Sequence, residues 1–473
     1  MELETIIGLE IHAQLSTKSK LWCGCDNDAF GAEPNTRVCP VCMGFPGMLP
    51  VLNKEGLDKA VRGAAALRCK IQKFSKFDRK NYFYPDLPNG FQISQYDQPI
   101  SCKGKVEISV DGKRHTIGIT RVHLENDAGK LVHTPSGTLC DYNRSGTPLV
   151  EIVTEPDLRS PEEAQILAKE IQKILRYVDA SDADMEKGMM RFDASVSLRH
   201  KGTEKLNPRA EIKNLNSFVS LFKALTYEIN RQKKLWEKGT PPDKETTVGW
   251  LDNEEKTVIM RDKESANDYR YFPEPDLPPV TFTDEAIEDI EKAVAELPSE
   301  KFHRYRSDFD LGEPEALKLS EDKVLADFFE QVVDLSDNPK KSANFILSVI
   351  LGNTSWKKSS IVPQQVADVI NLLEEGTISS TGAKEILIEA MKESQKDKTA
   401  KELMIDLDLE QVSSSNDLGK WVEEVIKTNP QSVDDYKKGK EKALQFLMGQ
   451  VMQISKGSAN PPKVLEMLKK RLS

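Results

Sequence analysis

Glu4-Thr5-Ile6-Ile7-Gly8-Leu9-Glu10-Ile11-His12 is the stretch that decides how the first part of the chain folds. Its apolar residues alternate with Gly8, Glu10 and His12. Because successive side chains of a strand point to opposite faces, one face of this segment is apolar. Glu10 and His12 then lie side by side on the opposite face. The segment predicts a strand that buries one face in a core and leaves a polar face for chemistry.

Three later segments alternate in the same way, at Thr120–Glu125, Arg191–Arg199 and Arg209–Lys213. The last two are joined by the polar loop 200–208, which predicts a hairpin. An antiparallel sheet with one solvated face also alternates, so no single strand identifies a site. Together, however, the polar faces collect groups that suit a hard divalent cation beside a phosphate. These groups are Glu10, His12, Arg121, Glu125, Arg191, Asp193, Glu211 and Lys213.

Helical patterns begin within this part and take over after about residue 296. Asn53–Leu67 is Ala-rich, and Ser160 followed by Pro161 and Glu163 predicts a capped helix start with a capping box. Helices are further expected at Glu321–Leu335, Ser342–Leu351, Pro363–Glu374 and Ser380–Met391, and apolar stripes at helical spacing follow in the tail.

The length of 473 residues is too great for one core and favours two to four domains. We expect an α+β protein with three domains. Residues 1–293 form a mixed or antiparallel sheet domain, residues 294–404 form an all-helical domain, and residues 405–473 form a small helical tail domain.

The net charge of −10 is unevenly distributed. Between Tyr436 and Ser473 there are nine Lys or Arg and two acids, which leaves −17 for the remainder. The basic tail is either a solvated helix face or a nucleic-acid-binding surface. No apolar run reaches the roughly 20 residues of a membrane span, and no targeting pattern is seen, so a cytoplasmic protein without membrane contact is expected.

Four of the seven cysteines fall within 20 residues, at Cys23, Cys25, Cys39 and Cys42. Two close pairs of thiols are typical of tetrahedral zinc, although the first pair is one residue tighter than usual. Four thiols leave no open coordination position, so the predicted 23–42 knuckle would hold a structural Zn²⁺. The alternative is four free thiols.

Common nucleotide and nucleophile motifs are missing from the sequence. There is no Gly-x-x-x-x-Gly-Lys-Ser/Thr, no Gly-x-Gly-x-x-Gly and no Gly-x-Ser-x-Gly. A nucleotide would therefore bind at an unusual site on the sheet.

Long motifs nevertheless resemble one family, the B subunit of tRNA-dependent aspartyl/glutamyl-tRNA(Asn/Gln) amidotransferases. The resemblance covers essentially the whole chain. It is carried by Ile7–Leu15, Phe30–Thr36, Gly44–Gly47, Leu49–Asn53, Lys76–Asp86, Gln92–Ile100, Asn143–Leu149, Asp268–Asp276, Gly449–Met452 and Lys456–Pro461.

The resemblance implies a cradle-like domain that holds a kinase and transamidation site, followed by a helical domain and a helical tail that contact tRNA. The implied reaction phosphorylates the side-chain carboxylate of a mischarged Glu-tRNA(Gln) or Asp-tRNA(Asn) with ATP and Mg²⁺. Ammonia then displaces the phosphate. The implied partners are a glutamine-hydrolysing amidase, the A subunit, and a small C subunit.

The resemblance also assigns roles to residues. Glu10, His12, Glu125 and Glu211 are the implied Mg²⁺ ligands, and Asp193 and Lys213 complete the catalytic set. Lys80, Arg121 and Arg191 are the candidate residues for binding the nucleotide. The family usually has Glu at the position of Asn126, which would slightly lower the negative charge at the site here.

Two other interpretations stay open at this point. The chain could be a non-catalytic, zinc-containing tRNA-binding scaffold whose polar strand faces are merely solvated. It could also resemble the archaeal-type variant, which is specific for Glu-tRNA(Gln). Those proteins usually carry an extra inserted domain before the tail. The distance from Gly352 to the tail is short here, which favours the bacterial-type heterotrimer.

Overall fold

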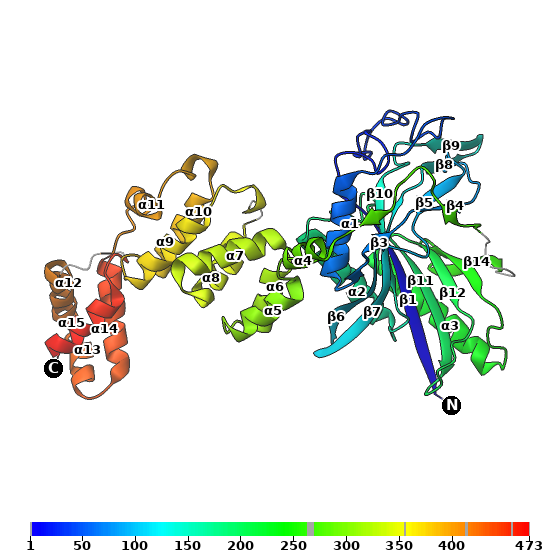
Figure 1. The fold of residues 1–473 in the computed structure, drawn as a ribbon. Helices are drawn as coiled ribbons and strands as arrows, with labels where there is room; N and C mark the ends of the chain where they lie inside the picture. Colours follow the sequence, from blue (N-terminus) through cyan, green and yellow to red (C-terminus); the bar gives the residue numbers. More distant parts are fainter. Residues whose placement is uncertain (1, 263–268, 354–355, 412–414, 456, 473) are drawn as a thin grey trace. The chain divides into compact units, whose positions relative to one another are not determined.

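The computed structural model describes residues 2–262, 269–353, 356–411, 415–455 and 457–472. Asp268 and Lys456, which begin two of the motifs quoted above, lie outside this range. The chain divides into two compact units, Met1–Pro298 and Ser299–Ser473 (Figure 1). In the described part, no helix is both long enough and apolar enough to cross a membrane.

The first unit is built on a nine-stranded sheet with the order β14-β13-β12-β11-β1-β10-β7-β6-β2. Only β12 and β13 pair in parallel among these neighbours, which confirms the mixed, mainly antiparallel sheet of the α+β prediction. The strands are β1 Leu3–Gln14, β2 Lys70–Ile71, β6 Ser101–Val110, β7 Lys113–Asn126, β10 Pro148–Thr154, β11 Met190–His200, β12 Ala210–Leu215, β13 Thr246–Leu251 and β14 Lys256–Asp262.

Three small sheets complete this unit, in the orders β15-β4-β5, β16-β3 and β8-β9. Their strands are β3 Phe74–Ser75, β4 Asp78–Asn81, β5 Phe91–Ser94, β8 Lys130–Thr134, β9 Gly137–Asp141, β15 Phe272–Pro273 and β16 Val280–Thr281.

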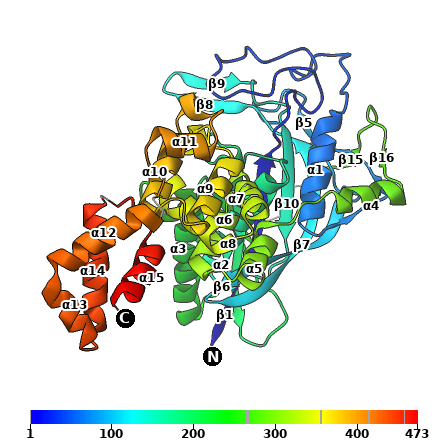
Figure 2. The ribbon, with the colours of Figure 1, turned by 90° about the vertical axis from the view of Figure 1, so that its left-hand side faces the viewer.

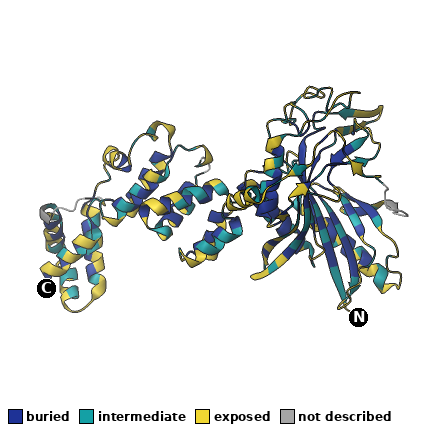
Figure 3. Ribbon diagram, viewed as in Figure 1, coloured by how far each residue is buried: buried dark blue, intermediate teal, exposed yellow. Residues whose placement is uncertain are grey.

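One face of the large sheet is buried under helices. Ile7, Leu9 and Ile11 of β1 are at most 2% exposed and share one hydrophobic core with apolar residues of α1 Lys54–Ala66, α2 Pro161–Tyr177 and α3 Phe218–Glu237. The strands are accordingly largely buried in Figure 3. The alternation predicted for the first strand is confirmed, and the opposite face carries the polar residues.

The predicted helix starts are confirmed by their caps, with one difference. The side chain of Asn53 accepts hydrogen bonds from Glu55 N and Gly56 N at the start of α1. The Ser160 side chain accepts from Glu163 N, as a capping box requires. The Glu163 carboxylate, however, accepts from the backbone N–H of Arg159 rather than Ser160, so the box closes one residue earlier.

The second unit is helical, and a short helix, α4 Asp284–Lys292, precedes it. Its elements are α5 Pro298–Ser307, α6 Glu313–Ser320, α7 Lys323–Ser336, α8 Pro339–Phe345, η1 Ile346–Ile350, η2 Trp356–Lys358, α9 Pro363–Glu374, α10 Ser380–Ala390, η3 Glu393–Gln395, α11 Ala400–Asp406, α12 Ser415–Thr428, α13 Pro430–Lys437, α14 Glu441–Ile454 and α15 Pro461–Leu472. Helices α7, α9 and α10 lie side by side (Figures 1 and 2).

Two hydrophobic clusters lie within this unit. One spans Tyr305 to Met404 and the other spans Leu418 to Leu472. The four helices predicted before the tail are present, but the 342–351 segment begins earlier, at Pro339 behind the cap of Asn338, and continues as a π-helical turn. The domain boundaries at 293/294 and 404/405 stay predictions.

Candidate functional site

Strand register brings the polar residues of four strands into rows. On β1, His12 lies opposite Arg191 of β11 on one side and Glu151 of β10 on the other. Glu151 in turn lies opposite His123 of β7. Because directly paired residues of antiparallel strands point to the same face, these side chains meet on the polar face of the sheet.

The centre of these rows is a cluster of three carboxylates and two imidazoles. His12 Nε2 lies 3.2 Å from Glu151 Oε2, 3.6 Å from Glu10 Oε1 and 3.8 Å from Glu125 Oε1. His123 Nε2 lies 3.4 Å from Glu151 Oε2 and 3.5 Å from Glu125 Oε2. The ligand atoms of Glu10, His12 and Glu151, and those of His123, Glu125 and Glu151, lie close enough together to hold a metal ion.

Burial and charge shape the protonation of this cluster. Burial lowers the pKa of His123, but the charges of Glu151 and Glu125 outweigh it and raise the pKa to about 9. Burial likewise opposes the protonation of His12, yet its hydrogen bond to Glu151 leaves its pKa raised. The pKa of Glu151 is held well below its usual value despite burial, because both imidazolium charges face it. The imidazoles and the carboxylates therefore stabilise each other's charged forms, and a metal ion bound through the Nε2 atoms would compete with protons there.

The donor set fits a hard divalent cation. Carboxylate oxygens with imidazole nitrogen are ligands of Mg²⁺ or Mn²⁺, whereas a soft metal prefers thiolates. Both rings turn Nε2 toward the carboxylates, and Nδ1 of each is buried without a hydrogen-bond partner among the described residues. The Ser94 hydroxyl donates to Glu125 Oε2 at 2.9 Å and fixes that carboxylate.

A lysine lies between two further acids beside the cluster. Lys213 Nζ is 2.7 Å from Asp193 Oδ2 and 2.8 Å from Glu211 Oε1. Burial lowers the pKa of Lys213, but the charges of Asp193 and Glu211 outweigh it and leave the pKa raised. Asp193 is also the β11 neighbour of Glu10. This places the Lys213 ammonium next to the candidate metal ligands.

Glu10, His123 and Glu151 of the cluster line one cavity of about 280 Å³ together with Lys213, whereas His12 and Glu125 are absent from its described lining. Lys80 and Arg121 also line it, as do the tyrosines Tyr96, Tyr269 and Tyr271. Lys80 Nζ lies 5.0 Å from the centre of the Tyr269 ring. Burial lowers the pKa of Lys80, but the charge of Glu125 outweighs it, so the pKa is raised. Cations therefore face the carboxylates across the cavity, as an anionic substrate bound to a metal would require.

The structure brings together most of the predicted site residues, with two differences. Glu211 belongs to neither metal-ligand group among the described residues and lies on the cavity wall beside Lys213. Arg191 turns to Asp127, with Nη1 3.1 Å from Oδ1, and is absent from the described cavity lining. Its guanidinium is thus engaged in holding Asp127 rather than facing the cavity.

Sequence reasoning missed Glu151 and did not assign His123 as a ligand. Glu151 is the single charged residue of β10, whose other residues are apolar or Thr. A single acidic residue within an otherwise apolar strand is the sequence pattern by which Glu151 could have been found. His123 lies on the polar face noted for its strand, between Arg121 and Glu125.

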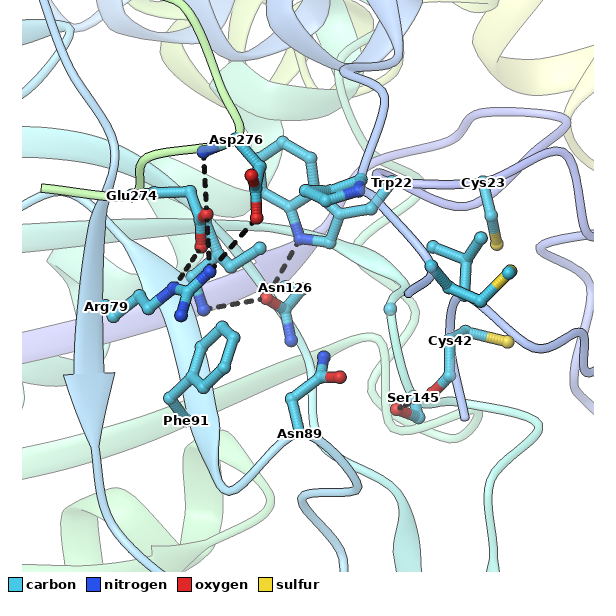
Figure 4. A pocket seen from close by; sticks show the side chains of 15 residues that line it. Trp22, Cys23, Cys42, Arg79, Asn89, Phe91, Asn126, Ser145, Glu274 and Asp276 are labelled. Atoms are coloured by element: carbon cyan, nitrogen blue, oxygen red, sulfur yellow. Dashed lines mark hydrogen bonds and ion pairs between the residues drawn. The ribbon is translucent and has the colours of Figure 1, made fainter. Parts of the chain in front are cut away.

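The structure corrects the expectation about Asn126. This residue points to the opposite side of β7 from Glu125, so it does not change the charge at the cluster. Its Oδ1 accepts hydrogen bonds from Trp22 Nε1 at 2.9 Å and from Ile93 N at 3.0 Å. Figure 4 shows Trp22 and Asn126 facing each other, with Arg79 paired to Glu274 nearby.

The four cysteines of residues 23–42 converge. Their sulfur atoms lie close enough together to hold a metal ion. Cys39 N donates to Cys42 Sγ at 3.2 Å, and Nζ of the fully buried Lys20 is 3.6 Å from the same sulfur. The hydrogen bond from Cys23, together with the Cys39 N–H and the charge of Lys20, lowers the pKa of Cys42 to about 5, whereas burial raises that of Cys25 to about 11. One thiol is thus prepared as a thiolate.

Comparison with known proteins agrees with the geometry. Residues 5–288 match the GatB/GatE catalytic domain and residues 327–472 match the GatB domain. Proteins named as the B subunit of aspartyl/glutamyl-tRNA(Asn/Gln) amidotransferase are similar over the whole chain. Those of Persephonella marina and Thermodesulfovibrio yellowstonii are 46% identical over 478 residues, and that of Thermoanaerobacter sp. is 47% identical over 479 residues. Each of the three alignments covers 100% of both chains. The chain therefore belongs to the GatB/GatE family.

Proposed function

We propose that this chain catalyses the ATP-dependent amidation of mischarged Glu-tRNA(Gln), Asp-tRNA(Asn) or both. The observation that carries the proposal is the cluster of Glu10, His12, His123, Glu125 and Glu151. Three of these residues, Glu10, His123 and Glu151, line a cavity together with Lys80 and Lys213. The names of the full-length relatives supply the substrate class.

The chemistry explains why such a site is sufficient. A carboxylate resists attack by ammonia because it is anionic and has a poor leaving group. Transfer of a phosphoryl group from ATP converts it into an acyl phosphate, whose phosphate leaves readily. Phosphoryl transfer relies mainly on positioning and charge stabilisation, so no covalent protein nucleophile is required. The absence of a nucleophile motif agrees with this scheme.

The residues divide this work by position. Glu10, His12, Glu125 and Glu151 would hold Mg²⁺, which supplies charge neutralisation on the transferring phosphoryl group. Lys80 faces the cluster from β4 and Lys213 from β12, and both present ammonium groups that bind phosphate or substrate carboxylate oxygens. Arg121, whose Nη2 is 3.7 Å from Glu151 Oε1, fixes that ligand.

The thiol cluster of residues 23–42 is proposed to hold a structural Zn²⁺. Four thiols within reach of each other match the ligand set that zinc prefers, and they leave no position for substrate. The metal would then stabilise the loops around it and take no part in the reaction.

The remaining assignments follow from the function. The relatives are named as subunits, so we propose a heterotrimer in which a glutamine-hydrolysing A subunit and a small C subunit join this chain and supply ammonia. Ammonia would pass between the proteins unprotonated, because ammonium has no lone pair. Mischarged tRNA is the other partner, and a tRNA substrate makes the cytoplasm the expected compartment.

Amidation with ammonium chloride as the nitrogen source tests the proposal without relying on the glutaminase. We expect the complex to convert Glu-tRNA(Gln) or Asp-tRNA(Asn) in an ATP-dependent reaction that Glu10→Gln or His12→Ala abolishes. Lys18→Ala, at an exposed position in the loop that follows β1, serves as the control. Full activity of both site variants would sink the catalytic proposal and support a binding scaffold.

A further inference from the structure

Asp127 is a buried carboxylate that directly follows β7 but does not join the candidate metal ligands of that strand. It comes two residues after Glu125 and is only 1% exposed. Among the described residues, it belongs to neither metal-ligand group and does not line the cavity of about 280 Å³. Burying an acid is costly unless the acid has charged or hydrogen-bonding partners, so the partners of Asp127 indicate what it does.

Both oxygens of Asp127 are occupied by donors from the protein. Oδ1 accepts from Ala128 N at 2.9 Å and from Arg191 Nη1 at 3.1 Å. Oδ2 accepts from Gln14 Nε2 at 3.2 Å, and Nε of Arg144 lies 3.5 Å from it. An ionised carboxylate offers about four acceptor positions in all, so little capacity remains for a metal ion. Asp127 is therefore placed to hold other side chains rather than to bind a cation of its own.

One of its two cationic partners, Arg144, fixes the backbone that carries this carboxylate. Arg144 Nε donates to Ala128 O at 2.9 Å, and its Nη2 donates to Gly129 O at 2.7 Å. Burial raises the pKa of Asp127, but the charges of Arg191 and Arg144 outweigh it and leave the pKa lowered. The carboxylate is thus held in one place and kept in its charged form.

The other cationic partner, Arg191, projects from the same sheet face as the metal ligands. On β11 it lies directly opposite His12 of β1, and directly paired residues point to the same face of a sheet. Burial lowers the pKa of Arg191, but the charge of Asp127 outweighs it, with further contributions from Glu125 and Asp193, and leaves the pKa raised. The guanidinium is therefore within electrostatic reach of the acids of the site, while its hydrogen bonds turn it to Asp127.

We propose that Asp127 is a positioning residue that holds the Arg191 guanidinium away from the acids of the metal-ligand cluster. This inference rests on the proposed function, in which that cluster binds a divalent cation. A guanidinium released by Asp127 would pair with Glu125 or Asp193, the other acids that act on it. A divalent cation would then have to displace the guanidinium, because two cations repel each other at one set of carboxylates. Asp127 thus keeps the carboxylates free for the metal without contacting it.

A double-mutant cycle tests this, with Mn²⁺ binding to the full-length chain measured by electron paramagnetic resonance. Asp127→Asn keeps the shape of the side chain and removes its charge, Arg191→Met removes the guanidinium, and the double variant removes both. Asp284→Asn, which breaks an exposed ion pair with Lys73, controls for the same chemical change elsewhere. The dependence of amidation on free Mg²⁺ is measured for the wild-type complex and for Asp127→Asn, with ammonium chloride as the nitrogen source.

We expect Asp127→Asn to weaken Mn²⁺ binding by about tenfold or more, the size of effect typical of groups that act on metal ligands from outside. The double variant should bind Mn²⁺ within about threefold of wild type, because no guanidinium remains to compete for the carboxylates. Arg191→Met and Asp284→Asn should each stay within about threefold as well. Amidation by Asp127→Asn should recover as free Mg²⁺ is raised, because occupancy of the metal site limits this variant.

Three outcomes overturn the inference. One is Mn²⁺ binding by Asp127→Asn that equals wild type. Another is a double variant that binds as weakly as Asp127→Asn, which would mean that the carboxylate supports the site by itself. The third is weak binding by Arg191→Met alone, which would mean that the guanidinium supports the metal ligands, and this variant decides the matter even where Asp127→Asn fails to fold.

Failure of the proposed function gives a different result. A wild-type chain that binds no Mn²⁺, or a wild-type complex that does not amidate Glu-tRNA or Asp-tRNA with ATP, contradicts the proposed function before any variant is compared.

Discussion

Glu151 is the residue that joins the two halves of the candidate metal site. Its Oε2 is 3.2 Å from His12 Nε2 and 3.4 Å from His123 Nε2, so both ligand groups share it. A neutral amide of the same shape would keep the packing but remove the charge that both imidazoles face. Loss of Glu151 should therefore affect metal binding more than folding.

We accordingly predict that Glu151→Gln lowers the rate of ATP-dependent amidation by at least about 100-fold, since even groups that only orient a metal ligand contribute 10- to 100-fold. Mn²⁺ titration followed by electron paramagnetic resonance should show weaker binding in the same variant. Glu155→Gln, a change in the exposed turn after β10, is the control. Tight Mn²⁺ binding by Glu151→Gln would contradict the assignment.

Lys20 is a fully buried lysine whose ammonium lies against a thiol of the cysteine cluster. Its Nζ also donates to Tyr142 O at 3.3 Å. Four thiolates around Zn²⁺ carry a net charge of −2, so a neighbouring ammonium offsets part of that charge. The lysine is thus expected to support the metal through Cys42 rather than to bind it.

We predict that Lys20→Met, which keeps the length of the stem, weakens Zn²⁺ retention by about 10- to 100-fold. Release of zinc to a chromogenic chelator measures this, and the sulfur-to-metal absorption of the Co²⁺ form reports the geometry. The exposed Lys18→Met is the matched control. Equal zinc retention in both variants would show that Lys20 has no part in the metal site.

At the scale of elements, helices α5 and α7 are joined by one acidic side chain. Glu330 of α7 accepts from Lys301 Nζ at 2.6 Å and from the Tyr305 hydroxyl at 2.8 Å, and it also pairs with Arg304. Lys301 is only 6% exposed. Removing the carboxylate takes the Glu330 charge away from a buried ammonium, and breaking a buried ion pair by removing one partner is costly.

We predict that Glu330→Gln lowers the free energy of unfolding of the second unit by about 2 kcal/mol. This loss is smaller than the roughly 3–5 kcal/mol expected on breaking a fully buried ion pair, because Glu330 is partly exposed. Urea unfolding followed by the tryptophans measures the change. Asp310→Asn, which breaks an exposed pair with Lys340, should leave the midpoint nearly unchanged. Similar midpoints for both variants would remove Glu330 from this role.

Glu330 should also make the stability of the second unit depend on pH. Burial alone would raise the pKa of Glu330, but the hydrogen bonds from Lys301 and Tyr305 outweigh it and leave the pKa lowered. A lowered folded-state pKa contributes stability that is present above the unfolded value, about 4.3, and lost as the pH falls through the folded value. The stability difference between wild type and Glu330→Gln should therefore shrink below about pH 4. A difference that stays constant down to about pH 2 would contradict this.

At the scale of the whole molecule, the basic charge is concentrated in the last helices. The second hydrophobic cluster of the helical unit, from Leu418 to Leu472, gives this part a core of its own. Its exposed lysines include Lys437, Lys438, Lys442 and Lys463. When such a surface binds the phosphates of a nucleic acid, counterions are released from the nucleic acid. The contribution of these lysines to tRNA affinity should therefore fall as the salt concentration rises.

We predict that removing residues 405–473 weakens tRNA binding by about tenfold or more at moderate salt, lowers the salt dependence and leaves ATP affinity unchanged. Filter binding at several salt concentrations measures this. Lys442→Glu with Lys463→Glu should weaken binding in the full chain, whereas Lys105→Glu with Lys113→Glu, on the exposed parts of β6 and β7, is the control. Unchanged tRNA affinity after truncation would sink the idea.

Features that depend only on neighbouring residues could be predicted from the sequence. Alternation placed Glu10 and His12 on one strand face, two pairs of cysteines marked the thiol cluster, and cap residues such as Asn53 and Ser160 marked helix starts. Each follows from backbone geometry repeated over a few residues. The sheet class and the helical second half followed from the same patterns.

The order in which the strands pair became known only from the folded structure. Glu151 lies far from His12 along the chain, yet β10 pairs directly with β1 and brings the two side chains together. The structure also shows that Arg191 of β11 turns to Asp127, whereas Asn126 points away from the site simply because it alternates with Glu125 along β7. Alternation is a local property of a strand, whereas pairing order and register depend on burying apolar faces contributed by distant segments. For that reason the polar residues of each strand could be predicted from the sequence, whereas the set of residues that meet in the site could not.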